Sequence, residues 1–388
     1  MRVEFLKAKD SDYDELVDFA NYVFSHSGEK TDFPSLLPKL YKKEYNTMKY
    51  HYIVKEDGKI KAIVGSFPME INVLGEVLKI SGIGTVSVHP YSRGSGYMKK
   101  LMNMALQDMK DDGIHISCLG GRRQRYEYFS YTPCGQKIGF YINEDNVNHK
   151  LKKLLNDNIA FEEIIDNDLE AIEKAYNIYN ENKVKVIREK CQFIDILKSW
   201  NSKVYSIMKN KEFIGYVVVS EDRKVINEIV ITNENEFLEV LSNYINQNNI
   251  EEVNLSMPLW EKDKIKILQE ICEGSLISNS HQFNIINYEE VLKVLLKLKA
   301  SYTKLQDGTL SINIKDYGNI KINVKDNNIT TLKSQELDKQ ENSIEATHLK
   351  AMQILFSPLG RYLIENEDLE FVSSWLPLPL HIPVQDNV

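Results

Sequence analysis

The hydrophobic and polar positions of the first 145 residues alternate between the periods of strands and helices. Residues 10–24 begin with capping-type residues and carry apolar positions at helical spacing, and the helical period returns over 96–113. Between these segments, β-rich runs turn at Asp57-Gly58 and near Gly75, which predicts two hairpins. Mixed strands joined by a crossover helix are typical of an α/β unit.

The rest of the chain repeats this order in a looser form and then changes character. From residue 286, a helix, two alternating strands, the segment NITTLKS and a second helix predict an α+β module with one antiparallel sheet. The Asn-rich, charged joints near 143–158 and 334–343 are predicted loops. We therefore predict an α/β (α+β) fold with three domains, at 1–150, 151–285 and 286–388.

The composition is that of a soluble globular protein, with 43% hydrophobic and 27% charged residues and no apolar run of about 20 residues. The start of the chain turns acidic within ten residues, which argues against a signal peptide. Scattered cysteines without paired or metal-binding spacing indicate reduced thiols in a cytoplasmic protein: Cys118, Cys134, Cys191 and Cys272.

The formal net charge of −8 argues against a nucleic-acid partner and favours cationic ligands. The eight histidines show no ligand spacing, so we expect no metal site. We also expect no membrane partner, because no segment has the length and apolarity of a transmembrane helix.

The stretch TVSVHPYSRGSGYMKKLM, residues 85–102, points to phosphate binding. A strand ends there, and Gly94 and Gly96 open a helix. Glycines at a helix start leave the first-turn N–H groups bare, and the positive end of the helix dipole attracts phosphate. Arg93 and Lys99 can add positive charge. The same pattern also fits a glycine-rich turn before a surface helix.

Basic and aromatic residues interleave in RRQRYEYFSYTPCG, residues 122–135. Such a stretch can stack on RNA bases, which the acidic net charge disfavours. It can also be a short helix that packs its rings on the sheet. The third interpretation is that one tyrosine is a general acid, since a phenol can return a proton to a leaving thiolate.

The chain ends in WLPLPLHIPVQDNV, residues 375–388. Its three prolines exclude a helix interior and a central strand, whereas its apolar residues are those of a buried segment. The segment is either an inert strap over a core or a means of bringing the chain end to a particular place.

The stretch after the first hairpins resembles the GNAT acyltransferase family, whose acyl-CoA motif reads R-x-x-G-x-G/A after a V-x-V-x-P strand. Arg93, Gly96 and the strand at 86–88 match, and Met98 departs from the final Gly/Ala position. The resemblance implies acetyl-CoA as co-substrate, with the strand holding the pantetheine arm and the loop holding the pyrophosphate. The implied binding residues are Val86, Ser87, Val88, Arg93, Gly94, Ser95, Gly96, Tyr97, Met98 and Lys99.

The order of elements resembles the enhanced-intracellular-survival (Eis) type of N-acetyltransferase: two GNAT-like domains and a sterol carrier protein-like domain. That family's Y-x-x-F-G-Y pattern is matched from Tyr126 to Tyr131, with Ser130 in place of Gly. The resemblance implies that Tyr126 is the general acid and that the α-carboxylate of Val388 is the base. It further implies direct transfer to an aminoglycoside-like, polycationic amine and a homo-oligomer, a hexamer in that family.

The second domain offers a contrast. After its strand at 224–231 comes TNENEFLEVL, which has acids in place of the arginine and glycines of a phosphate loop. We therefore expect this domain to bind no CoA. Two alternatives to the amine acetyltransferase stay open: a non-catalytic acyl-CoA-binding or regulatory protein, and an acyltransferase for a protein or peptide amine.

Overall fold

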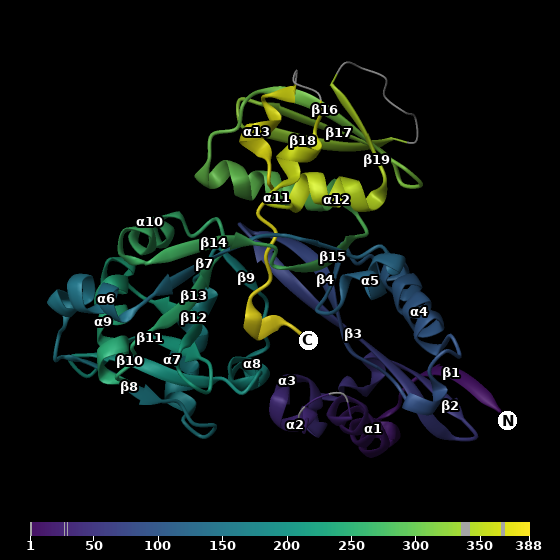
Figure 1. The fold of residues 1–388 in the computed structure, drawn as a ribbon, viewed down its shortest axis with the longest axis horizontal. Helices are drawn as coiled ribbons and strands as arrows, with labels where there is room; N and C mark the ends of the chain where they lie inside the picture. The colour runs from purple at the N-terminus through teal and green to yellow at the C-terminus, as the bar shows by residue number, and fades with distance from the viewer. Residues whose placement is uncertain (1, 27, 29, 335–341, 366–368) are drawn as a thin grey trace.

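The computed structural model describes residues 2–26, 28, 30–334, 342–365 and 369–388. Three sheets with their helices form three units, and the third unit stands above the other two in Figure 1. The predicted α/β (α+β) fold class, with mixed sheets flanked by helices, is confirmed. In the described ranges, no helix combines the length and the apolarity needed to cross a membrane.

The first unit is built on an eight-stranded sheet, and both predicted hairpins are present in it. Its path is β1 (Val3–Lys7), β2 (His51–Glu56), β3 (Lys59–Val73), β4 (Glu76–Val88), β5 (Ile116–Leu119), β15 (His281–Ile285) and β6 (Thr132–Cys134), with β9 (Val184–Val186) beside β3. Its helices are α1 (Tyr13–Ser25), α2 (Phe33–Leu36), α3 (Pro38–Tyr41), α4 (Tyr97–Asp111) and α5 (Arg123–Tyr126).

The second unit is built on a seven-stranded sheet. Its path is β8 (Ile159–Glu163), β10 (Lys203–Lys209), β11 (Glu212–Val219), β12 (Val225–Ile231), β13 (Val253–Met257), β7 (Lys137–Ile142) and β14 (Gly274–Ser278). Its helices are α6 (Glu144–Asn146), α7 (Leu169–Asn180), α8 (Phe193–Lys198), α9 (Phe237–Gln247) and α10 (Lys262–Ile271).

The two sheets follow the same pattern of pairing. In each path, three antiparallel pairs lead to one parallel pair, β4–β5 or β12–β13, and two antiparallel pairs follow. The sixth strand of each path comes from the other side of the predicted boundary. Strand β7 lies within 1–150 but pairs in the second sheet, and β15 lies within 151–285 but pairs in the first. The first sheet thus takes β15, and also the short strand β9, from residues 151–285, and the second sheet takes β7 from residues 1–150.

In its described residues, the third unit contains a four-stranded sheet and three α-helices. Its strands in spatial order are β18 (Asn328–Ser334), β17 (Gly318–Lys325), β16 (Gly308–Ile314) and β19 (Ser343–Ala346), and its helices are α11 (Tyr288–Tyr302), α12 (His348–Phe356) and α13 (Val372–Trp375). The prediction of one antiparallel sheet is wrong at its edge, because β19 pairs with β16 in parallel. The sequence pattern missed β19 because it is only four residues long.

The predicted loop at 143–158 is also wrong. It contains α6, a π-helix at Val147–Leu151 and a 3-10 turn at Lys152–Leu154. Val147 and Leu151 are buried in the core of the second unit, so two apolar anchors outweigh the polar composition of the segment. Most of the other predicted loop, 334–343, lies outside the described residues.

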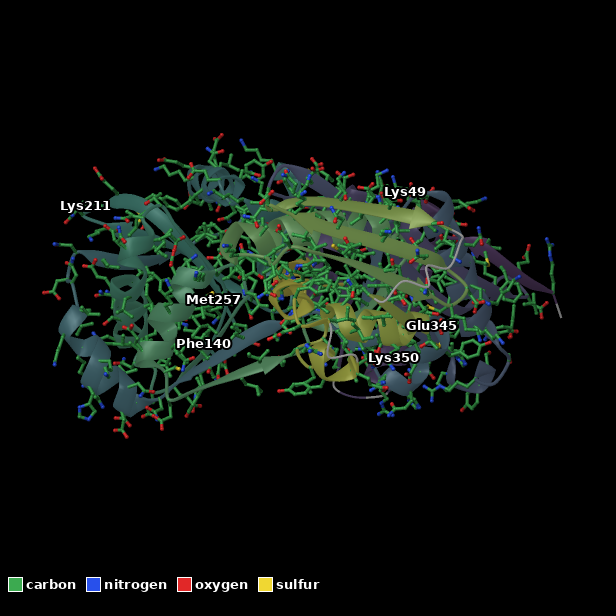
Figure 2. All side chains as sticks on the ribbon, turned by 90° about the horizontal axis from the view of Figure 1, so that it is seen from above. Lys49, Phe140, Lys211, Met257, Glu345 and Lys350 are labelled. Carbon is green, nitrogen blue, oxygen red and sulfur yellow. The ribbon has the colours of Figure 1, made fainter. Side chains whose placement is uncertain are left out.

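The largest hydrophobic core joins the third unit to the first sheet. It includes Ile80 and Ile116 from that sheet, Leu292 and Leu295 from α11, and Trp375 before the C-terminal segment. The second unit has a core of its own, in which Phe140 of β7 and Met257 of β13 are buried; Figure 2 labels both on the same side of the molecule. The third unit is therefore fastened to the first by apolar burial.

Candidate active site

Strands β4 and β5 separate at the centre of the first sheet. They pair in parallel from Ile80 opposite Ile116 to Ile83 opposite Leu119, where β5 ends. Strand β4 continues to Val88 beside β3. Within the described part of the chain, no strand pairs with residues 84–88 on the β5 side. The N–H and C=O groups on that side are therefore free of strand pairing and can bind an extended ligand.

Thr85 interrupts the regular course of β4. Its φ of +53° is unusual for a β-branched residue, and the register between β3 and β4 shifts at this level. The buried Tyr41 hydroxyl bonds to Thr85 Oγ1 and lies 3.1 Å from His51 Nε2. His51 Nδ1 donates to the Thr47 carbonyl oxygen at 3.2 Å, so Nε2 is the acceptor. Burial lowers the pKa of His51 to about 4, and the ring stays neutral.

A glycine-rich loop connects β4 to α4. Gly94 and Gly96 have φ values of +86° and +77°, which glycine adopts without strain. Gly96 is the N-cap residue of α4 and offers no side chain to bind the first-turn N–H groups. An added Cβ at either glycine would meet no atom within 4 Å, so the loop faces open space. This is the geometry of an anion-binding helix start.

A cavity of about 730 Å³ lies between the free edge of β4 and this helix start. Nine of the ten predicted cofactor-binding residues line it: Val86, Ser87, Val88, Arg93, Gly94, Gly96, Tyr97, Met98 and Lys99. The tenth, Ser95, belongs to the same loop but is not among the lining residues. The hydroxyl of Tyr97 donates to Glu56 and its ring packs on Phe5, so much of this side chain serves the core.

Two arginines at the cavity were not predicted to bind the cofactor. Arg122 and Arg125 line it together with Phe129, as do Arg93 and Lys99. The interleaved basic and aromatic pattern of 122–135 drew attention to this segment, but sequence alone did not place it beside the loop. Four basic side chains around one cavity suit a ligand with several phosphate groups.

Tyr126 is the last residue of the short helix α5. In the sequence it lies between Arg125 and Phe129, which both line the cavity. It is 5% exposed and is not itself among the lining residues. Its ring packs on Gly121, where a Cβ would come within 2.5 Å of it. Burial raises the pKa of Tyr126, and the Arg125 guanidinium opposes this shift. The phenol therefore stays protonated at neutral pH and can donate a proton.

The other tyrosines of this cluster have different environments. Tyr131 is fully buried, and its hydroxyl lies 2.7 Å from Ser117 Oγ, which in turn donates to the Ser81 carbonyl oxygen. Tyr128 is 64% exposed, with Lys99 Nζ 4.8 Å from its ring centre. Tyr131 thus serves the core. Tyr126 is the buried tyrosine that lies next to the cavity wall.

The C-terminal segment runs from the third unit down between the other two, as the yellow chain in Figure 1 shows. Trp375 Nε1 donates to the Gln306 carbonyl oxygen at 2.9 Å. Gln136, in the link between β6 and β7, donates its side-chain amide to the Leu378 carbonyl oxygen at 3.0 Å and its backbone N–H to that of Leu380 at 2.9 Å. A 3-10 turn at Val384–Asp386 follows. The segment is extended and buried, as its prolines and apolar residues predict.

Val388 lies against strand β4. A Cβ on Gly82 would be 2.5 Å from Val388 Cγ2, and a Cβ on Gly84 would be 3.0 Å from the terminal carboxyl carbon. Only glycine therefore leaves room for the chain end at both positions. The terminal carboxyl group therefore lies beside Gly84, the residue before Thr85, just beyond the last pair between β4 and β5.

Val388 also lines a second cavity, of about 400 Å³, between the first and second units. Phe67 and Glu70 of β3 line it from the first unit, and Glu189 and Gln192 from the second. Glu70 and Glu189 are exposed. The described residues contain no group of three or more His, Cys, Asp or Glu side chains that could hold a metal ion. This cavity offers carboxylates, whereas the first offers cations.

The sequence of the first unit matches a family model described as acetyltransferase (GNAT) domain over residues 4–134. Residues 4–134 form a GNAT acetyltransferase domain. The protein is therefore an acyltransferase. GNAT domains use acetyl-CoA, and the cavity between β4 and the start of α4 has the open strand edge and the positive charge that this co-substrate needs. No curated protein matches the chain.

Solved structures resemble the whole chain and not the GNAT domain alone. A probable N-acyltransferase from Enterococcus faecalis V583 has a TM-score of 0.68 at 16% identity, covering 99% of this chain and 98% of its own. A GCN5-related N-acetyltransferase from Anabaena variabilis has a TM-score of 0.67 at 15% identity, with 98% of each chain covered. Eis1 from Mycobacterium abscessus has a TM-score of 0.66 at 13% identity, with both chains fully covered. At identities this low, the TM-scores and the coverage show a shared fold and nothing further.

Proposed function

We propose that the protein is an acetyl-CoA-dependent N-acetyltransferase that acetylates primary amines of a polycationic, aminoglycoside-like small molecule. The observation that carries the proposal is the place of Val388, which lies against Gly82 and Gly84 at the level where β4 leaves β5. The same strand lines the basic cavity a few residues later, at Val86 to Val88. A donor in the basic cavity and an acceptor in the second cavity would meet at this point of the strand.

The basic cavity suits the donor. The free edge of β4 offers hydrogen bonds to the amides of the pantetheine arm, and the N-terminus of α4 offers N–H groups to the pyrophosphate. Arg93, Lys99, Arg122 and Arg125 add four positive charges around the same space.

The second cavity suits a cationic acceptor. Its basic side chains, Lys39 and Arg188, are buried, and both already hold other groups of the chain. The accessible charges are the carboxylates of Glu70 and Glu189, one from each unit, together with the terminal carboxylate of Val388. An amine with several positive charges can pair with these groups.

The chemistry is a direct transfer in a ternary complex. The acceptor ammonium gives a proton to the Val388 carboxylate, directly or through a water molecule, and the neutral amine forms a C–N bond with the thioester carbonyl carbon. Backbone N–H groups of β4 stabilise the developing oxyanion. The C–S bond then breaks and Tyr126 donates its proton to the leaving thiolate. The nitrogen loses its second proton to solvent, from which Tyr126 regains one, and the Val388 carboxyl group loses its proton to solvent. The amine leaves as its N-acetyl derivative, and acetyl-CoA leaves as CoA thiol.

The remaining units have supporting roles in this proposal. The second unit, without a glycine-rich loop, walls the acceptor cavity, and the third, sterol carrier protein-like unit delivers the chain end. The homo-oligomer, a hexamer by the Eis-type resemblance, stays a prediction that sedimentation velocity would test.

The decisive experiment is CoA-thiol release from acetyl-CoA with panels of aminoglycosides, polyamines and basic peptides. Tyr126→Phe and a form without the last four residues are compared with intact protein and with Tyr362→Phe, whose side chain is 84% exposed in the third unit. We expect turnover with cationic small amines, reduced about 100-fold or more in the first two forms and unchanged in the control. Turnover confined to peptides would favour a protein or peptide acceptor. Acetyl-CoA binding without any turnover would favour a non-catalytic protein.

A further inference from the structure

Residues 385–387, just before the terminal Val388, are held by side chains from two different units. Lys39, at 6% exposure, comes from α3 of the first unit. Its Nζ donates to the carbonyl oxygens of Gln385 and Asn387, the latter at 2.6 Å. Both hydrogen-bond partners of this ammonium among the described residues belong to the C-terminal segment. Asn387 is the residue directly before the terminal Val388.

Arg188 holds the same segment from the second unit. Its side chain is 1% exposed, and it forms a two-bond contact with Asp386, Nε to Oδ1 at 2.9 Å and Nη2 to Oδ2 at 2.8 Å. On its other edge it forms a second such contact with Glu228, at 2.9 and 2.7 Å. The guanidinium plane also lies 4.1 Å from the ring centre of Tyr179.

The geometry of these contacts allows little movement of Asp386. A planar guanidinium that binds two carboxylates along its edges fixes both their distance and their orientation. Because the group is buried, breaking one contact would leave a charge without water or a partner, which is costly. Gln385 adds a third anchor: its side chain is fully buried and donates to the Leu197 carbonyl oxygen of α8 at 2.6 Å.

These anchors end one residue before the terminal carboxylate. Val388 itself is only partly buried and lies over Gly82 and Gly84 of β4, so its position follows from that of Asn387. The Arg188–Glu228 contact already joins β12 to the loop after β9. The further contact of Arg188 with Asp386 holds only the C-terminal segment. The same is true of the hydrogen bonds from buried Lys39 to the carbonyl oxygens of Gln385 and Asn387.

We propose that Lys39 and Arg188 are positioning residues that clamp residues 385–387 and thereby hold the terminal carboxylate at the acceptor cavity. The inference rests on the proposed function, in which this carboxylate takes the proton of the amine. It places one half of the clamp on each side of the acceptor cavity, so the first and second units must be in their observed relation for the carboxylate to reach its place.

The test measures the position of the tail and the catalysis separately. Lys39→Met removes the ammonium with little change in volume, and Asp386→Asn weakens the tail contact while Arg188 keeps Glu228. Matched controls are Lys43→Met and Asp166→Asn, which change exposed ion pairs with Asp14 and Lys198 in the same two units. Release of Val388 by a carboxypeptidase, followed by mass spectrometry, reports on the tail without reference to activity. Steady-state kinetics give kcat and the two KM values.

We expect Val388 to be released at least tenfold faster from Lys39→Met and Asp386→Asn than from intact protein. We also expect kcat to fall at least tenfold while the KM for acetyl-CoA stays within twofold, because the donor cavity lies elsewhere. Both controls should match intact protein. Since Lys39→Met could impair folding, thermal unfolding is recorded for each form, and Asp386→Asn carries the test if the lysine variant is unfolded.

Unchanged release of Val388 from both folded variants would overturn the clamp, whatever happens to kcat. Faster release with unchanged kcat would support the clamp and overturn the proposed role of the carboxylate. The failure of this inference and the failure of the proposed function are therefore distinguishable.

Discussion

At the scale of single residues, glycines and one buried lysine decide whether the chain end can reach β4. Gly82 and Gly84 are needed because any side chain there would occupy the place of Val388. Lys39 is needed to hold the two carbonyl groups just before it. Neither role is visible in the sequence, because the partners lie more than 300 positions away along the chain.

Gly82→Ala should therefore displace the terminal residue. The added methyl group would come within 2.5 Å of Val388 Cγ2. The terminal residue can move away more easily than β4, which is held by its neighbouring strands. We expect kcat for amine acetylation to fall about tenfold or more, with a loss of at most about 1–3 kcal/mol in the free energy of unfolding. Gly274→Ala is the control, since a Cβ there meets no atom within 4 Å. Equal kcat values for the two variants would contradict this account.

Lys39 should also make stability depend on pH. Burial lowers its pKa from the ordinary 10.5 to about 7, although Asp386 opposes the shift. Between these two pKa values the unfolded chain holds a proton that the folded chain lacks. Stability therefore rises as pH increases from about 7 to 10, by up to about 1.4 kcal/mol per pH unit.

Urea denaturation of intact protein and Lys39→Met at several pH values would measure this contribution. We expect the difference in unfolding free energy between the two forms to grow in favour of intact protein from pH 7 to 9.5. The comparison cancels the titration of other groups that both forms share. Parallel curves would show that Lys39 keeps its charge throughout this range.

At the scale of helices and strands, the exchange of β7 and β15 is the main feature of the fold. Strand β15 fills the place between β5 and β6 in the first sheet, with Phe283 opposite both Cys118 and Thr132. The catalytic unit therefore lacks its sixth strand when it is cut at the boundary predicted from the sequence. Strand β7 plays the same part in the second sheet.

A fragment of residues 1–150 should not fold on its own, because β5 and β6 would each expose a buried edge. We expect it to lack a cooperative thermal transition and to bind a dye specific for exposed apolar surface. A fragment in which a flexible linker joins residues 280–286 to its end should regain the transition. Failure of the linked form, or cooperative folding of the shorter one, would contradict the proposed dependence on β15.

The sequence predicted local elements well and long-range pairing poorly. The hairpins at Asp57-Gly58 and Gly75 follow from turn chemistry, and α4 follows from helical spacing after Gly96. These signals lie within a few residues of the elements that they predict. The exchanged strands depend on partners more than 100 residues away, so no local pattern could have revealed them.

The candidate site divides in the same way. The glycine-rich loop and its strand were found from sequence because they are contiguous, and nine of their ten residues line one cavity. Arg122 and Arg125 line that cavity from another part of the chain. Glu70 and Glu189 line the second cavity from two different units. Only the fold brings these side chains together.

At the scale of the whole molecule, two cavities of opposite character lie along two neighbouring strands, the first at β4 and the second at β3. Basic side chains surround the donor cavity, and exposed carboxylates from two units line the acceptor cavity. This distribution of charge fits the proposed pair of substrates, an anionic donor and a cationic acceptor, although the net charge of the chain is −8.

The double variant Glu70→Gln, Glu189→Gln should weaken acceptor binding. We expect the KM for a polycationic amine to rise about threefold to tenfold, since each exposed carboxylate contributes less than about 1 kcal/mol. The effect should shrink in 0.5 M salt, which screens exposed charges. The KM for acetyl-CoA should stay constant. A rise in the KM for acetyl-CoA alone would place the two carboxylates on the donor side.

The first two sheets share one order of antiparallel and parallel pairs, and strands β7 and β15 each complete the sheet of the other unit. Because of this exchange, neither unit could be deleted or replaced without leaving a gap in the sheet of the other. The second unit is therefore required for a complete first sheet, apart from anything that it contributes to the chemistry.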